Sequence, residues 1–258
     1  MTTLDIPAAL PLGGAHRTAA AKRGTANPQF LARLTGILFL ITFITSIPPV
    51  LSLYVPVLSD PAYITGSGTG TGLSWGAILE LLLIVANIGS AIALFPIARR
   101  QSETLALGFV ASRIMESAFI AMGIVALLAI GTLRLSATGA DAGAMMAVGK
   151  ALVAVHDWTF RLGPGVVVGI GNGLILGTLM WRSKLVPRGL AILGLIGGPL
   201  ILASGAAVVL GAIQGLSMWQ GFATVPEFFW ELGFGLWLTI KGFNPAALAR
   251  LMDGEASK

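Results

Sequence analysis

Charged side chains inside long apolar stretches are the residues of this chain with the clearest capacity for chemistry. Thr104–Gly131 is apolar apart from Arg113 and Glu116, which are its only two charges. The two are three residues apart, so a helix presents both on one face. Each charge at the centre of a bilayer costs about 2.5–3.5 kcal/mol on insertion scales, so such a pair must be buried against protein, paired or wetted. The stretch predicts a membrane span with a polar centre.

Three further carboxylates interrupt other apolar stretches. A rise of about 1.5 Å per residue places Glu80 roughly 8 Å below the outer end of its span, and Glu227 and Glu231 one turn apart on the last span. We therefore expect Glu80, Arg113, Glu116, Glu227 and Glu231 to form a polar pocket in the outer half of a bundle. Four carboxylates and one arginine cannot all be ionised and neutralised by one another. Such a pocket could bind a proton, a cation or a small cationic solute, and Glu227 or Glu231 is a candidate for holding a proton.

Structural ion pairing is an alternative interpretation of the same residues. In that case Arg113 pairs with Glu116 or Glu231 and holds helices together, while the remaining carboxylates are wetted at the outer interface. A regulatory or sensing role is a third interpretation. The residue types leave all three open.

A second polar group is expected at the outer mouth of the fourth span, where His156, Asp157 and Arg161 follow one another closely. Asp157 and Arg161 are four residues apart, which favours a local ion pair. We interpret His156 as an interfacial polar residue rather than a metal ligand, with a pH-sensing role as an alternative. The chain has no cysteine, and its other histidine, His16, is remote in sequence, so no metal site and no cofactor are expected.

Enzyme motifs are missing from the sequence. It contains no His-Glu-x-x-His, no Gly-x-Ser-x-Gly and no P-loop. We therefore expect a protein that is not an enzyme.

Four glycines recur at intervals of four residues, at Gly165, Gly169, Gly173 and Gly177. On a helix this spacing forms one smooth ridge, and small residues let a neighbouring backbone approach closely. We interpret this glycine ridge as a helix-packing surface rather than as a path for solute.

The composition is that of a polytopic membrane protein. Hydrophobic residues make up 55%, charged residues 10%, and the mean hydropathy is +0.88, whereas soluble domains carry about 25% charge. We therefore predict an all-α transmembrane helical bundle with six spans, in a lipid bilayer. The spans are expected near Leu34–Tyr54, Trp75–Ala98, Thr104–Gly131, Trp158–Trp181, Gly189–Ile213 and Val225–Ile240. Pro48-Pro49 should kink or end the first span early, Gly163-Pro164 should bend the fourth near its start, and an interfacial helix over Asp141–Trp158 should lead into the fourth.

Basic residues indicate the orientation of these spans. With the N-terminus inside, the inner segments hold twelve Lys and Arg residues and the outer loops hold two, Arg134 and Lys150. This bias predicts that both termini are cytoplasmic. Because the positive charges flank apolar segments, the net charge of +5 does not indicate a nucleic-acid partner. Three parts are expected: a disordered basic tail over 1–32, a membrane domain over 33–245 and a short cytoplasmic tail over 246–258.

Three stretches resemble a known family. They are Gly108-Phe-Val-Ala-Ser-Arg-Ile-Met-Glu-Ser117 with its Arg-x-x-Glu motif, the basic loop Trp181–Arg188, and the ending Glu231–Phe243. Together they resemble the bacterial membrane proteins grouped as domain of unknown function 4386, over roughly residues 33–245. The resemblance implies a multi-pass helical bundle of uncharacterised role in a bacterial inner membrane. By resemblance, Arg113, Glu116 and Glu231 match polar positions of the family, as does the His156-Asp157 region.

Two functional hypotheses of different classes follow. The first is a small transporter-like or ion- or proton-binding protein with an outward-facing acidic pocket. The second is a non-transporting scaffold or sensor, which assembles as a homo-oligomer or with other membrane proteins. The second predicts that the glycine ridge faces lipid in the monomer.

Overall fold

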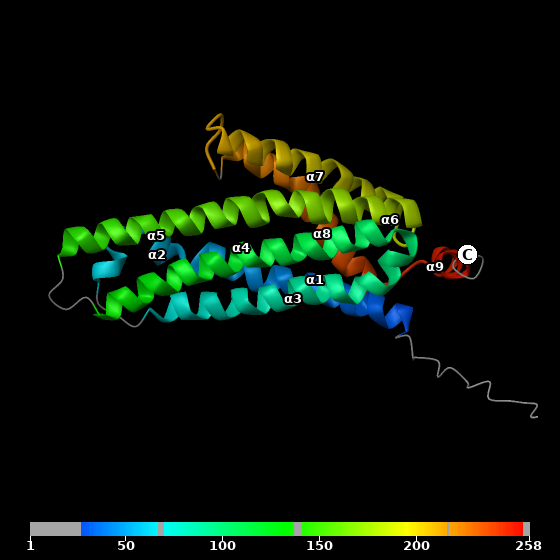
Figure 1. The fold of residues 1–258 in the computed structure, drawn as a ribbon, viewed down its shortest axis with the longest axis horizontal. Helices are drawn as coiled ribbons and strands as arrows, with labels where there is room; N and C mark the ends of the chain where they lie inside the picture. Colours follow the sequence, from blue (N-terminus) through cyan, green and yellow to red (C-terminus); the bar gives the residue numbers. More distant parts are fainter. Residues whose placement is uncertain (1–26, 67–69, 137–140, 216, 255–258) are drawn as a thin grey trace, which may run out of the picture.

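The computed structural model describes residues 27–66, 70–136, 141–215 and 217–254, and every regular element in these ranges is a helix (Figure 1). Most of the predicted tail over 1–32 lies outside the described residues. The α-helices are α1 (Pro28–Pro48), α2 (Val55–Ser59), α3 (Thr71–Gln101), α4 (Glu103–Ser136), α5 (Ala142–Leu162), α6 (Gly177–Ser183), α7 (Arg188–Val209), α8 (Met218–Ile240) and α9 (Pro245–Asp253). The described residues also form a 3-10 helix, η2 (Tyr63–Thr65), and three π-helical segments: η1 (Pro49–Leu53), η3 (Gly163–Val167) and η4 (Gly169–Leu176).

The first helix begins six residues before the predicted Leu34. Asn27 caps it by accepting a hydrogen bond from the Gln29 backbone N–H, and Pro28 occupies a first-turn position where its missing donor costs nothing. Its α-helical geometry ends at Pro48, as the proline pair predicts, and η1 continues as a π-helical turn. At the other end of the bundle, the Gln29 side chain donates to the Phe243 carbonyl and accepts from its N–H, both at 2.9 Å.

The predicted fourth span lies within a longer helical run. One continuous run of 42 residues, Ala142–Ser183, comprises α5, η3, η4 and α6. Pro164 lacks the backbone donor of an α-helical turn, and the chain adapts by widening to π-helical geometry over Gly163–Val167 instead of breaking. The stretch Asp141–Trp158, expected as an interfacial helix leading into the fourth span, is helical from Ala142 and continues into Trp158–Trp181 without a break.

Among the residues that the structure describes, five helical runs are long and apolar enough to cross a membrane: Pro28–Leu53, Thr71–Gln101, Glu103–Leu135, Ala142–Ser183 and Arg188–Val209. The sixth predicted segment falls in α8, which is not one of them. At about 1.5 Å per residue, the 42-residue run exceeds the roughly 30 Å hydrocarbon thickness by a wide margin. In Figure 1, the adjoining ends of α3, α4 and α5 reach well beyond the α7–α8 connection.

Two main apolar clusters stabilise the bundle. The larger one surrounds Phe39, Trp230 and Phe234, which are buried between α1, α7 and α8. A smaller one lies in the extension formed by α3, α4 and α5, and includes Tyr54, Ile64, Leu73, Leu127 and Ile130. The polar side chains described below lie between these two clusters.

The glycine ridge packs against α7. A Cβ added at Gly169 would lie 2.8 Å from the Gly198 carbonyl oxygen, and one at Gly173 would collide with the Gly198 Cα. A Cβ at Gly177 would meet Leu195 at 3.3 Å. These three glycines are buried and Gly165 is partly buried, so the ridge is covered by the chain's own helices.

Substitution of Gly173 by leucine should reduce the amount of folded protein in membranes. The added side chain has backbone of α7 in its path, which cannot give way as a side chain would, and overpacking typically costs about 1–3 kcal/mol or more. Gly221→Leu is the matched control, because a Cβ at exposed Gly221 meets nothing within 4 Å. Size-exclusion profiles and thermal unfolding in detergent measure the effect. Equal yield and melting temperature for Gly173→Leu and wild type would contradict the packing role.

Candidate functional site

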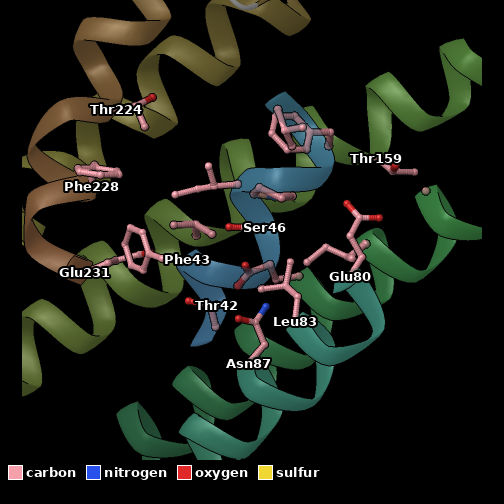
Figure 2. A pocket seen from close by; sticks show the side chains of 18 of the residues that line it. Thr42, Phe43, Ser46, Glu80, Leu83, Asn87, Thr159, Thr224, Phe228 and Glu231 are labelled. Atoms are coloured by element: carbon pink, nitrogen blue, oxygen red, sulfur yellow. The ribbon is translucent and has the colours of Figure 1, made fainter. Parts of the chain in front are cut away.

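A cavity of about 480 Å³ lies within the bundle (Figure 2). Its walls come from α1, η1, α3, α4, α5, η3, α7 and α8. All five side chains of the predicted polar pocket line it: Glu80, Arg113, Glu116, Glu227 and Glu231. His156 lines the same cavity. In the view of Figure 2, Phe228 and Glu231 of α8 lie on the opposite side from Glu80 of α3.

Arg113 and Glu116 form an ion pair within α4. Arg113 Nη1 donates to Glu116 Oε2 at 2.9 Å, and both side chains are almost fully buried. The guanidinium also lies over the Phe39 ring of α1, 5.1 Å from its centroid, in a cation–π contact. The guanidinium of Arg113 is thus held by the Glu116 carboxylate of its own helix and by the Phe39 ring of a neighbouring helix.

Glu231 is held by the π-helical segment. Its Oε1 accepts a hydrogen bond from Asn172 Nδ2 of η4. The Asn172 backbone carbonyl accepts from the indole N–H of Trp230 at 2.8 Å, so the same residue is fixed to α8 through two groups. Wider helical turns occur frequently at functional positions, and this one directs an amide toward the cavity carboxylate.

Glu227 differs from the other cavity carboxylates. It is only 2% exposed, and neither of its carboxylate oxygens has a hydrogen-bond partner among the described residues. It lies against glycines of two neighbouring helices, since a Cβ at Gly173 would be 2.9 Å from its Oε2 and one at Gly197 would be 2.6 Å from the same atom. The carboxylate is therefore tightly enclosed on the protein side and lines the cavity on the other.

Glu80 belongs to a second polar group in the cavity wall, together with Tyr54 and His156. The Tyr54 hydroxyl donates to its Oε2 at 2.8 Å, and the Tyr54 ring packs edge-on against His156, with centroids 5.8 Å apart. Tyr54 is fully buried. Sequence reasoning missed Tyr54 as a partner of Glu80, although a lone tyrosine at the end of an apolar segment, with a hydroxyl to satisfy, was an available signal.

The residues predicted for the outer mouth remain close to one another, with His156 Nδ1 3.7 Å from Asp157 Oδ1, but they line different cavities. His156 is buried and lines the main cavity, whereas Asp157 lines a separate cavity of about 240 Å³ with Asp60 and Lys150. Asp157 Oδ2 lies 3.9 Å from Arg161 Nη2, a loose and partly exposed pair. His156 is buried, and its helix begins well before it, at Ala142.

The remaining wall is largely apolar. Phe43, Phe160 and Phe228 provide aromatic surface, and Asn87 adds a buried amide whose nitrogen has no hydrogen-bond partner among the described residues. Within the same residues, no three His, Cys, Asp or Glu side chains are arranged so that they could hold a metal ion. The site thus combines clustered carboxylates with hydrophobic walls.

A protein-family model described as a domain of unknown function (DUF4386) matches residues 34–242. The chain belongs to this family. The match confirms the resemblance and extends from within α1 past the end of α8, so every residue that lines the cavity lies in the DUF4386 region. No curated protein and no solved structure matches the chain.

Replacing Arg113 by methionine should destabilise this DUF4386 protein strongly. The substitution leaves Glu116 and its acidic neighbours without their buried cation, and breaking a buried ion pair from one side typically costs about 3–5 kcal/mol. Adding Glu116→Gln to Arg113→Met should recover part of the loss, since one uncompensated carboxylate is removed. Thermal unfolding of the two single variants and the double variant in detergent measures the coupling. Strictly additive losses would contradict a direct pair.

Proposed function

We propose that this protein is a small transporter-like membrane protein that binds a cation or a proton in an outward-facing acidic cavity. The observation that carries the proposal is the convergence of four carboxylates and one arginine from three helices on one cavity. Arg113 is already paired with Glu116. The remaining carboxylates exceed the positive charge available to them, and an enclosed site of this kind favours a positively charged ligand.

The proposal includes six spans, with both termini on the cytoplasmic side of a bacterial inner membrane. α8 would be the sixth span, and its surface supports this role: Trp219, Phe222 and Phe229 are each more than half exposed. Such a surface is suited to lipid. The excess of Lys and Arg in the predicted inner segments supports the orientation.

Cysteine labelling tests whether α8 crosses the membrane, because the chain contains no cysteine. Ala212→Cys lies in the connection before α8 and Asp253→Cys at the end of α9, both at exposed positions. A membrane-impermeant maleimide should label Ala212→Cys in cells with an opened outer membrane, and Asp253→Cys only after the inner membrane is permeabilised. Equal labelling of both positions before permeabilisation would contradict a sixth span.

Reconstituted vesicles test the binding function. With an imposed proton or cation gradient, wild-type protein should mediate uptake, and Glu116→Gln and Glu231→Gln should each reduce it by about tenfold or more, since each removes a charge that faces the cavity. Glu103→Gln, at an exposed position at the start of α4, is the control and should retain wild-type uptake. Unchanged uptake in both cavity variants, or no uptake by the wild type, would contradict the proposal.

The scaffold or sensor alternative relied on a glycine ridge that faces lipid. Gly169, Gly173 and Gly177 are instead buried against α7, which argues against that surface as a docking site for partners. No specific contact in the described residues favours this alternative over the binding function.

A further inference from the structure

Glu227 is the cavity carboxylate that the protein itself leaves without a partner. Glu116 accepts from Arg113, Glu231 from Asn172, and Glu80 from Tyr54. Both oxygens of Glu227 lack such a donor among the described residues, although the residue is only 2% exposed. Burying an unpaired charge is costly, so this carboxyl group requires either a proton or an external cation. The geometry therefore leaves one counter-ion position open.

The shape of the cavity indicates the size of that cation. About 480 Å³ falls within the range of sites for small organic molecules and is far larger than a dehydrated inorganic ion. A hard metal cation needs a close cage of about six or more oxygens, whereas the carboxylates here are distributed over α3, α4 and α8 and partly occupied by protein donors. A larger ligand that reaches Glu227 with one charged group fits better.

The walls indicate that the rest of the ligand is apolar. Phe43 and Phe228 meet edge to face, with ring centroids 5.4 Å apart, and both line the cavity. Aromatic faces attract organic cations as well as apolar groups.

The exposed residues among those that line the cavity lie on two sides. Ile47, Val50 and Leu51 are at the end of α1 and in η1, whereas Thr224 and Phe228 are in α8. All of them except Thr224 are apolar, so an opening between these two sides has largely apolar walls and favours a ligand that partitions toward lipid.

We propose that the cavity binds an amphiphilic organic cation, with its charged group at Glu227 and its apolar body against Phe43 and Phe228. The inference rests on the proposed cation-binding function and names its substrate class. Binding exchanges one proton for the cation: the O–H bond of the Glu227 carboxyl breaks, the proton leaves to water, and the carboxylate pairs with the ligand.

The groups around Glu227 leave it as the cavity carboxylate without a donor among the described residues. α4 contributes Arg113 and Glu116, already paired, while α8 contributes Glu231 with its Asn172 donor, and α3 and α5 contribute Glu80 and His156 farther out. α1 lines the cavity with Thr42 and Ser46, and α7 faces Glu227 through Gly197. Asn172 is an uncharged donor, so a ligand with one positive charge does not exceed the negative charge of the cavity carboxylates.

Binding of tetraphenylphosphonium to the purified full-length protein in nanodiscs tests the inference. Wild type should bind this probe and release about one proton per cation into weakly buffered solution. Glu227→Gln should weaken binding about 30-fold or more and abolish the proton release, because it removes the buried counter-charge while keeping the side-chain shape. Phe43→Ala combined with Phe228→Ala should weaken binding about tenfold and keep the proton release.

Matched controls separate the site from general effects. Phe222→Ala removes a 63% exposed ring of the same helix, and Glu103→Gln removes an exposed carboxylate, so both should bind like wild type. Size-exclusion profiles establish that each variant is folded. Tetramethylammonium, which has the charge without the apolar body, should bind at least about tenfold more weakly than tetraphenylphosphonium.

An amine-bearing lipid headgroup offers the same charge as a dissolved cation. Nanodiscs with and without phosphatidylethanolamine distinguish the two sources. If the lipid amine occupies the site, it competes with the probe, and probe binding is weaker in nanodiscs that contain this lipid. Equal binding in both kinds of nanodisc assigns the site to a dissolved cation. Either result supports an amphiphilic organic cation as the class of ligand.

Two results would overturn the inference in different ways. If the probe does not bind, or binds Glu227→Gln as tightly as wild type, while sodium or proton uptake still depends on the cavity carboxylates, the substrate class is wrong and the cation-binding function stands. If neither binding of the probe nor uptake of an inorganic cation or proton depends on those carboxylates, both proposals fail together.

Discussion

Charged groups inside an apolar helical bundle must find their partners within the protein, and in this chain Arg113 is the buried cation on which that requirement depends. Its guanidinium is held by Glu116 on the same helix and by the Phe39 ring of α1. The cation–π contact joins α4 to α1, and the larger apolar cluster holds the same two helices together with α8, so the arginine lies where apolar and polar packing meet. The polar centre is thus part of what determines the packing.

The glycines and the carboxylates form one arrangement. Gly173 and Gly197 lie where any Cβ would collide with Glu227, and Gly198 brings α7 against η4 at backbone contact. Larger residues at these positions would displace α8 and separate Glu227 from the cavity. Close packing of η4, α7 and α8 therefore positions the Glu227 carboxylate, and the glycine ridge makes that close packing possible.

Local sequence signals predicted those features that depend on one helix. The apolar lengths identified the main helical segments, and the three-residue spacing of Arg113 and Glu116 predicted that they share a face. Contacts between elements that are distant in the sequence were harder to predict. The Tyr54–Glu80 hydrogen bond requires η1 to return beside α3, and no spacing in the sequence encodes that approach. Continuity of the helix through Gly163-Pro164 was expected, with a bend, but the π-helical form that the chain takes there has no signal in the local sequence.

The position of His156 shows how helix length controls the access to the cavity. Because α5 begins at Ala142, the residues before His156 join α3 and α4 in an apolar extension instead of forming an open polar mouth. Tyr54 is fully buried in that extension and contacts both Glu80 and His156. A ligand that moved along the bundle axis would have to displace this buried group. The exposed residues that line the cavity lie instead at the end of α1, in η1 and in α8, so access from this side of the bundle would require no such displacement.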